Sequence, residues 1–406
     1  MQLDKSFTFG NLGVAKMANS QDELFAEICS KLEKTNNFKI FLDEVQSAID
    51  YSDNVQIDMV SALSSVLVDS DSVNIWFFQL PVDYEKPLIW LSVVYNTGTT
   101  KFVWSVGYIS KMTQTIQNLI KPNLSLLDQI QLLQIPKSPP FLIYFEPVQS
   151  STWQMSSDLP VIEDINELDI LQVSYEGSNL KEDVDQTLIM NVNFLQMQGL
   201  KLENRVRDFG SVELINFCEQ HVFPNLGLLT ALHVEVHNWG HFLGYFPFSN
   251  DKNISSYESV EEYRACLVGG VFGIHLLPSK ISLALCVVIV LNRLLIYGFE
   301  PYLRSDEDKT FQDVREISVA VFFYQNLKME AVLSIQDQKL DLDVENLIAV
   351  FLKTGLAIQE MEKKANKDQQ ILEKYAIDAF SKAYPDRQFP KDLSDFYSCL
   401  SQKYYP

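Results

Sequence analysis

All five histidines of this 406-residue chain lie between positions 221 and 275. Three of them recur at four-residue spacing in the segment LHVEVHNWGHFL, as His233, His237 and His241. On an α-helix, residues four positions apart lie on one face, so adjacent imidazoles of this series converge without backbone strain. Because imidazole is the commonest metal-binding side chain in proteins, the spacing predicts a metal site on a helix.

A further ligand is expected from the next predicted helix, which carries the segment YESVEEYRA. Glu258 and Glu262 form an i, i+4 carboxylate pair in this segment, and Glu261 adjoins them. If the helix packs against the histidine helix, one carboxylate meets a histidine pair. Two histidines and one carboxylate leave coordination positions open, as catalytic metal sites require. Arg264 and Arg293 are alternative ion-pair partners for Glu262.

The strings HNWGH and EEYRA resemble the zinc motifs of gluzincin-type zincin metallopeptidases. They are similar in particular to those of the dipeptidyl-peptidase-III family, whose zinc helix reads HELLGH and whose glutamate helix reads EECRAE. The resemblance covers only about 237–265, and the interval from His241 to Glu262 is of the kind that these proteins use. It implies that His237, His241 and Glu262 hold a zinc ion.

The sequence departs from the family pattern at two points. Three residues separate His237 from His241, where the dipeptidyl-peptidase-III motif has four. Asn238 follows His237 at the position where the peptidases keep the glutamate that activates water. Asparagine cannot accept a proton from water at neutral pH, so the resemblance favours a metal site and argues against general proteolysis.

We interpret the chain as a metal-dependent enzyme in which zinc-activated water acts on a small-molecule or peptide-like substrate. Glu258 and His233 are the predicted acid/base residues, and Asn238 is predicted to orient the substrate. Two alternatives remain open. The same ligands suit a non-haem iron(II) oxygenase or oxidase, and loss of the motif glutamate suits a non-catalytic, degenerate zincin that binds a partner. The oligomeric state is left undetermined by the sequence.

The other two histidines receive structural interpretations. His221 precedes a Val-Phe-Pro sequence and is predicted to lie in a loop or at a helix entry. His275 follows the glycine-rich segment GGVFG and is predicted to be buried and hydrogen-bonded. These glycines lie in an apolar helical stretch and lack the strand and the GK[ST] sequence of a nucleotide cradle, so they indicate close helix packing.

The distribution of strand and helix signals predicts an α+β fold. β-Branched and aromatic residues predict strands at 72–80, 88–95, 101–108 and 141–145, the middle two as a hairpin. Helical spacing predicts helices at 21–33, 38–50, 211–219, 226–243, 257–276, 281–299, 311–328 and a pair within 343–384. The predicted domains are a mixed helix and strand part at 1–150, a connecting region at 151–205 and a mainly helical metal-binding part at 206–406.

Charge and cysteine content narrow the class of protein. The formal charge of −21 disfavours nucleic acid and anionic membranes as partners, because both need basic surfaces. The five cysteines are scattered and odd in number, which favours a reducing, cytoplasmic location. The most apolar stretch, Ile281–Tyr297, contains Asn292 and Arg293 and is predicted to be a buried core helix and not a membrane span.

Overall fold

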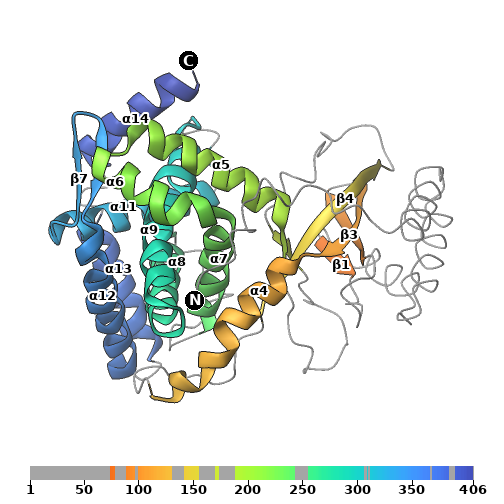
Figure 1. The fold of residues 1–406 in the computed structure, drawn as a ribbon, viewed down its shortest axis with the longest axis horizontal. Helices are drawn as coiled ribbons and strands as arrows, with labels where there is room; N and C mark the ends of the chain where they lie inside the picture. Colours follow the sequence, from red (N-terminus) through yellow and green to blue (C-terminus); the bar gives the residue numbers. More distant parts are fainter. Residues whose placement is uncertain are drawn as a thin grey trace. The chain divides into compact units, whose positions relative to one another are not determined.

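The computed structural model shows two compact units. One comprises residues 9–115 and 140–196, and the other includes 116–139 and 197–406. The residues described are 74–77, 88–96, 99–129, 141–154, 170–172, 188–242, 255–305, 309, 311–365, 368–383 and 389–405. The α+β class predicted from the sequence is confirmed, with a strand-rich unit and a mainly helical unit (Figure 1). The predicted domain boundaries at 150 and 205 stay a prediction.

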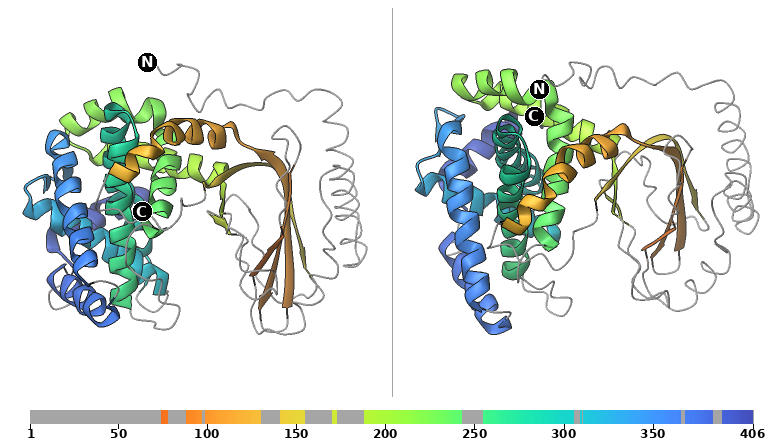
Figure 2. Two further views of the ribbon diagram at one scale, coloured as in Figure 1. Left: turned by 90° about the horizontal axis from the view of Figure 1, so that it is seen from below. Right: turned by 60° about the horizontal axis from the view of Figure 1, so that its bottom comes forward.

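The strand-rich unit holds a six-stranded sheet in the order β1-β2-β3-β4-β6-β5, drawn edge-on in Figure 2. Its strands are β1 (Asn74–Phe77), β2 (Leu88–Asn96), β3 (Thr99–Ile109), β4 (Ile143–Gln154), β5 (Ile170–Gln172) and β6 (Leu188–Asn191). All neighbouring strands are antiparallel except β4 and β6. The predicted hairpin is confirmed as β2 and β3, with Asn96 opposite Thr99.

One predicted strand proves much longer than the sequence indicated. The strand expected at 141–145 is β4, which continues to Gln154 through the polar segment QSSTWQ. This segment pairs residue by residue with β3, up to Lys101 opposite Gln154. Backbone pairing along a long partner strand therefore extends β4 where side-chain pattern gives no signal. The helices predicted at 21–33 and 38–50 lie outside the described residues.

The mainly helical unit carries the histidine segment. Its longer helices are α5 (Val192–Phe209), α7 (Leu226–Phe242), α8 (Ser255–Leu276), α9 (Ser279–Asn292), α11 (Phe311–Met329), α12 (Val344–Ala365), α13 (Gln369–Ala383) and α14 (Lys391–Tyr404). Shorter elements are α4 (Lys111–Ile120), η2 (Lys121–Gln129), α6 (Val212–Phe217), η4 (Cys218–Val222), η5 (Phe223–Asn225), η6 (Arg293–Tyr297), α10 (Phe299–Tyr302) and the hairpin β7 (Leu333–Gln336) and β8 (Lys339–Leu342).

The helices predicted between 211 and 384 are confirmed, with small shifts at their ends. Among the described residues, the helices α4, α5, α10 and α14 were not predicted. Helix α5 begins at Val192, inside the segment that composition marked as a connection. Its polar residues made the segment look like a linker, although one face, with Leu195, Leu202 and Val206, is buried.

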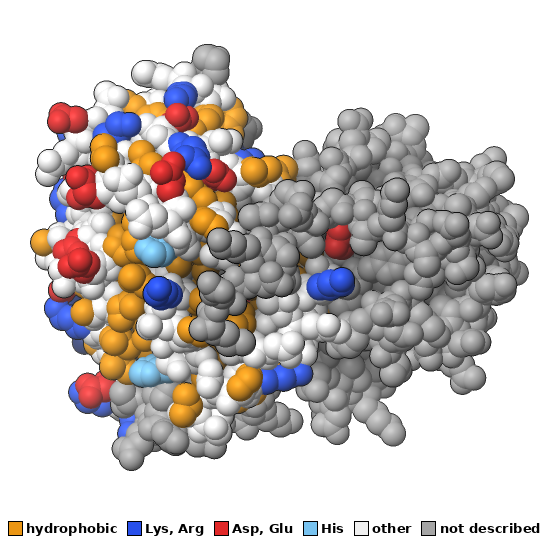
Figure 3. Space-filling view, viewed as in Figure 1, with side chains coloured by type: hydrophobic (Ala, Val, Ile, Leu, Met, Phe, Trp, Pro, Cys, Tyr) orange, Lys and Arg blue, Asp and Glu red, His pale blue; other side chains and the backbone are white. Residues whose placement is uncertain are grey.

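On the face of the helical unit seen in Figure 3, acidic and basic side chains are interspersed among apolar ones.

Helix α9 forms the centre of the helical core. The residues from Ala284 to Leu291 are each at most 2% exposed, which confirms the predicted core helix. Among the described residues one stretch, Ser279–Tyr302, is long and apolar enough to cross a membrane by length and composition, and 89% of its most apolar window is buried inside the protein. It packs against α7, α8 and α12.

Helices α7 and α8 make an unusually close antiparallel contact at two glycines. A Cβ atom added to Gly240 would lie 2.0 Å from the carbonyl oxygen of Ala265, and one added to Gly269 would lie 2.0 Å from that of Val236. No side chain therefore separates the two backbones at these points. The close packing predicted for the glycine-rich segment is confirmed, and it brings the histidine helix against the glutamate helix.

We predict that Gly269→Ala lowers the free energy of unfolding by about 1–3 kcal/mol or more, because a backbone clash cannot be relieved by a rotamer change. The matched control is Gly199→Ala in α5, where the added Cβ meets a flexible side chain, Leu226, at 3.3 Å. That control should change stability by less than about 1 kcal/mol. Urea unfolding followed by circular dichroism measures both, and equal effects would contradict the close contact.

Candidate metal centre

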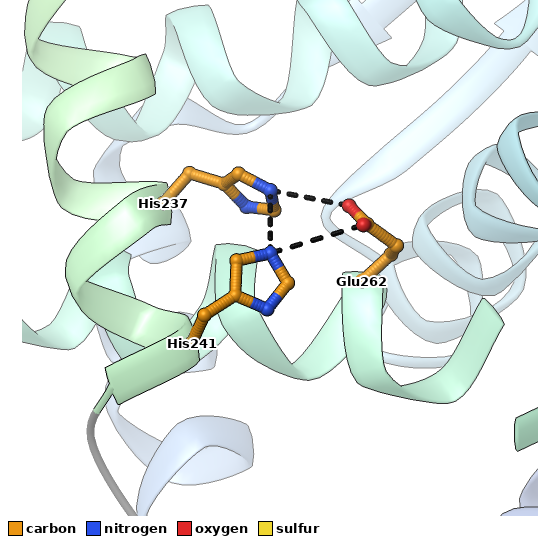
Figure 4. Close-up of side chains that lie close together, drawn as sticks. All are labelled: His237, His241 and Glu262. Carbon is orange, nitrogen blue, oxygen red and sulfur yellow. Dashed lines mark hydrogen bonds and ion pairs between the residues drawn. The ribbon is translucent and has the colours of Figure 1, made fainter. Parts of the chain in front are cut away.

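His237, His241 and Glu262 lie together between α7 and α8 (Figure 4). His237 Nε2 lies 3.1 Å from His241 Nε2 and 3.1 Å from Glu262 Oε2. His241 Nε2 lies 3.8 Å from Glu262 Oε1. In the described part of the chain, these three residues are the group whose ligand atoms are close enough to hold one metal ion. The convergence predicted from the helical spacing is thus present in the structure.

The triangle has the size that a metal ion requires. Zinc bonds to histidine nitrogen and carboxylate oxygen at about 2.0–2.1 Å, and a tetrahedron of that radius separates neighbouring ligand atoms by about 3.3 Å. The separations of 3.1, 3.1 and 3.8 Å, in which His237 and His241 face different oxygens of the Glu262 carboxylate, bracket this value. The three side chains are 13–17% exposed, so the site is largely shielded but has an opening to solvent. The residues present fit a divalent ion.

Neighbouring groups hold both imidazoles by their second nitrogen. His241 Nδ1 lies 3.0 Å from Glu261 Oε1, and because a carboxylate only accepts, Nδ1 carries the proton and Nε2 keeps its lone pair. His237 Nδ1 lies 3.3 Å from the sulfur of Cys266, which can accept in the same way. A carboxylate behind a metal-binding histidine fixes its tautomer and orientation. Both Nε2 atoms can therefore face a cation together.

Burial controls the ionisation of the triangle. Burial, and after it the neighbouring His241 imidazole, lower the pKa of His237 to about 4. Burial alone would raise the pKa of Glu262, but contacts with His237, His241 and Arg315 outweigh it and hold that pKa well below its usual range. At neutral pH the triangle thus combines a neutral His237 imidazole with an ionised Glu262 carboxylate, and this is the protonation state in which the two groups bind metal.

A buried charge network supports the Glu261 carboxylate. Arg264 donates from Nη1 to Glu261 at 3.3 Å and to the carbonyl oxygen of Gly240 at 2.9 Å. The same guanidinium pairs with Glu362 of α12, and the side chains of Arg264 and Glu362 are 1% and 0% exposed. The contact between α7 and α8 and the position of Glu261 therefore depend on one arginine. The sequence had suggested Arg264 as an ion-pair partner of Glu262. In the structure Arg264 pairs with the adjacent residue, Glu261.

Two further arginines flank the triangle. Arg293 contacts Glu262 Oε2 at 3.4 Å, as the sequence had suggested, and Glu316 Oε2 at 2.6 Å. Arg315 lies 3.6 Å from Glu262 Oε1 and donates to Glu316 Oε1 at 3.1 Å. Sequence analysis did not identify Arg315 or Glu316, which lie on α11, about 50 residues beyond Glu262. It also gave no role to Cys266, although its i, i+4 spacing from Glu262 was a usable signal.

Two of the three predicted catalytic residues, His233 and Asn238, are described with their side chains. His233 is buried one turn before His237, with its ring centroid 6.3 Å from that of His237 and its Nδ1 3.1 Å from Asn292 Nδ2. Burial, Arg293 and His237 hold its pKa well below the usual value, so it is neutral. Asn238 is 7% exposed, and its Nδ2 has no hydrogen-bond partner among the described residues. Glu258 lies in α8, one turn before Glu262.

The remaining histidines lie outside the site. His221 lies in the π-helical turn η4 at the surface, where its ring packs against Phe217 with centroids 4.9 Å apart. His275 was predicted to be buried, and this prediction is wrong. It is exposed in the last turn of α8, because the apolar face of that turn is supplied by Leu276 and Leu277.

Comparison with known proteins gives a fold but no family. No protein-family model matches the chain, and no curated protein matches it. Among solved structures, the chain is similar to the structure of dipeptidyl-peptidase III from Corallococcus sp. strain EGB, with a TM-score of 0.50 and 11% sequence identity. The similarity covers 95% of this chain and 67% of that one. At this identity it supports a common fold, and the His-His-Glu cluster is compatible with a zincin-type site.

We predict that the metal-free protein loses stability as the pH falls from about 6.5 toward about 4. The folded pKa of His237 is about 4, whereas an unfolded histidine has a pKa of about 6.5. Over this interval the unfolded chain binds a proton that the folded chain does not, so stability rises with pH. Urea unfolding at several pH values with a chelator present measures the slope.

The control for this prediction is a pair of histidine variants. His237→Gln should reduce the pH dependence without abolishing it, because the fold also holds His233 neutral. His221→Gln, which changes an exposed histidine, should leave it as in the wild type. Equal slopes for the wild type and His237→Gln would show that His237 is not held neutral by the fold.

Proposed function

We propose that the chain is a zincin-like metal-dependent enzyme that binds one divalent ion through His237, His241 and Glu262. Zinc is the favoured ion. The triangle of ligand atoms carries this proposal. Three side chains from two helices direct acceptor atoms toward one point, at separations that match a tetrahedral ion. Burying the ionised Glu262 carboxylate beside a neutral His237 imidazole is costly without a cation to balance it.

A zinc ion in this position supplies Lewis acidity, which polarises a carbonyl group and lowers the pKa of coordinated water. The chain's own residues then have separate tasks. Glu261 fixes the tautomer of His241, and Cys266 contacts Nδ1 of His237. Glu258, on the same helix face as Glu262, is the proposed proton acceptor in place of the glutamate that Asn238 replaces. His233 is neutral and is the second proposed acid/base group.

The proposed substrate is a small molecule or a peptide-like compound. The similar solved structure is that of a peptidase, which suggests hydrolysis of an amide or related bond. Asn238 argues against efficient general proteolysis, because a missing acid/base group typically costs about 10²–10⁴-fold in rate. Asn238 Nδ2 is buried and has no hydrogen-bond partner among the described residues, and it is the proposed donor to a bound substrate.

Iron(II) is the alternative metal, since two histidines and one carboxylate also form the facial triad of non-haem iron oxygenases. A second candidate function is that of a non-catalytic, degenerate zincin. One observation favours it: Arg293 already contacts Glu262 Oε2 and His237 Nε2, both at 3.4 Å. A guanidinium in this position can balance the carboxylate without a metal ion. Metal content separates the three functions.

We predict stoichiometric zinc in the purified wild type and its loss in His237→Ala and in His241→Ala, with both variants folded. Each variant removes one of three ligands from a site that needs all of them. Elemental analysis by mass spectrometry measures the metal, and circular dichroism measures the fold. His275→Ala, an exposed histidine of the same helical unit, is the matched control and should keep full occupancy. Full occupancy in both ligand variants would place the metal elsewhere.

We also predict that the zinc-loaded wild type does not cleave unstructured peptide mixtures at rates typical of peptidases. The residue that follows His237 cannot take the proton that peptide hydrolysis requires. Mass spectrometry of the peptide mixture after incubation, with and without chelator, measures cleavage. Asn238→Glu should not produce a general peptidase by itself, since the spacing and the buried position of residue 238 are unchanged.

Robust, metal-dependent cleavage by the wild type would contradict this prediction. In that event Glu258→Gln identifies the base. Loss of cleavage in this variant would show that Glu258 performs the proton transfer, and retained cleavage would direct attention to His233.

A further inference from the structure

Arg293 is fixed in place beside the proposed metal centre by bonds that use most of its guanidinium. Its Nε donates to the sulfur of Cys266 at 3.0 Å, and its Nη1 donates to Glu316 Oε2 at 2.6 Å. Its plane lies over the ring of Tyr297, with 5.1 Å between the guanidinium carbon and the ring centroid. The side chain is only 5% exposed, so it has no room to swing into solvent.

The backbone at Arg293 is also constrained. Helix α9 passes into the π-helical turn η6 at this residue, and the amide of Gly298 donates to the carbonyl oxygen of Arg293 at 3.0 Å. Carbonyl groups of this turn are capped by side chains from other helices. Tyr397 of α14 donates to Leu294, and Arg205 of α5 donates to Leu295. π-Helical turns often occur at functional sites, where they re-aim a side chain.

The third nitrogen of the guanidinium, Nη2, makes only long hydrogen bonds and can donate to another group. Nη2 contacts His237 Nε2 and Glu262 Oε2, and both contacts are 3.4 Å, at the long end of hydrogen bonding. These two acceptors are the atoms that the proposed metal would engage. With a metal bound, His237 Nε2 can no longer accept from Arg293, so Nη2 then faces the centre with a positive charge and a hydrogen atom to donate.

The charge balance of the cluster also changes when a metal ion binds. Without metal, the carboxylates outnumber the guanidiniums by one among the groups that contact the triangle and its supports, namely Glu261, Glu262, Glu316, Glu362, Arg264, Arg293 and Arg315. A divalent ion converts this excess into one positive charge. In a mostly buried site, an unbalanced charge of this kind attracts a counter-ion strongly.

We propose that Arg293, with Arg315 at the other oxygen of Glu262, forms an anion subsite beside the metal centre, so that the ligand of this centre carries an oxyanion group such as a carboxylate or a phosphate. A guanidinium matches the geometry of paired anionic oxygens, which favours these groups over neutral amides. The inference rests on the proposed function and narrows it, because it makes the preferred substrate an acidic compound and assigns its anionic group to Arg293.

An anion subsite at Arg293 and a purely structural role for Arg293 predict different effects on the metal and anion affinities. A fixed positive charge beside a metal ion weakens binding of the cation and strengthens binding of an anion. Removing this charge should therefore change the two affinities in opposite directions. Damage to the fold would weaken both.

The experiment uses the full-length protein loaded with cobalt(II), whose visible spectrum reports on ligands at the open coordination position. Cobalt affinity is measured first, and acetate and inorganic phosphate are then titrated separately into the loaded protein. The variants are Arg293→Met and the double variant Arg293→Met with Glu316→Gln, which leaves no unpaired charge at the ion pair. Arg207→Met, an exposed arginine of α5 that pairs with Glu203 and Glu219, is the matched control.

Arg293→Met and the double variant should bind cobalt about tenfold more tightly than the wild type and the better anion about tenfold more weakly, given a unit charge a few ångströms away. Arg207→Met should change neither affinity. A better response to acetate than to phosphate would assign the subsite to carboxylates, and the reverse would assign it to phosphates. A wild-type spectrum that no anion changes, or anion affinity that survives in both Arg293 variants, would overturn the subsite.

These outcomes separate the subsite from the proposed function. If the wild type binds cobalt through His237 and His241 but shows no anion response, the metal centre stands and the subsite fails. If the wild type binds neither cobalt nor zinc, the metal centre fails, and the subsite fails with it.

Discussion

The close antiparallel contact between α7 and α8 is the constraint on which the site depends. Gly240 and Gly269 allow the two backbones to meet without intervening side chains. This approach places Glu262 against the imidazoles of His237 and His241, 3.1 and 3.8 Å away. An added methyl group at either glycine would separate the helices. The candidate metal site thus depends on backbone packing. The histidine spacing on α7 can form such a site only because α8 packs closely against α7.

The sequence predicted the parts of this arrangement that depend on local periodicity. Four-residue spacing placed three histidines on one face, and the resemblance of EEYRA to a glutamate helix selected Glu262. It could not predict Arg315 and Glu316, because their position depends on how α11 packs against α8. It also missed α5 and the extent of β4, where tertiary packing and strand pairing override a polar composition. His275 was misassigned because an apolar stretch does not show which face its last turn exposes.

The electrostatics of the site explain why the metal-binding and metal-free functions compete. Glu262 is held ionised in a shielded position, and a cation must balance it. A divalent ion on the triangle does so, and Arg293 does so in part from 3.4 Å. Asn238 removes the usual proton acceptor of a zincin but keeps a polar group without a hydrogen-bond partner among the described residues. The arrangement is compatible with the proposed metal centre, in which Arg293 is the proposed anion-binding group.

X-ray absorption spectroscopy of the purified, metal-loaded protein tests the central claim most directly. The account predicts a zinc edge and a first shell of nitrogen and oxygen atoms at about 2.0–2.1 Å, with the multiple scattering of two imidazoles. An iron edge with the same shell would keep the ligands and change the chemistry. A sulfur atom at about 2.3 Å would place Cys266 or another cysteine in the first shell, and it would contradict the His237, His241 and Glu262 site.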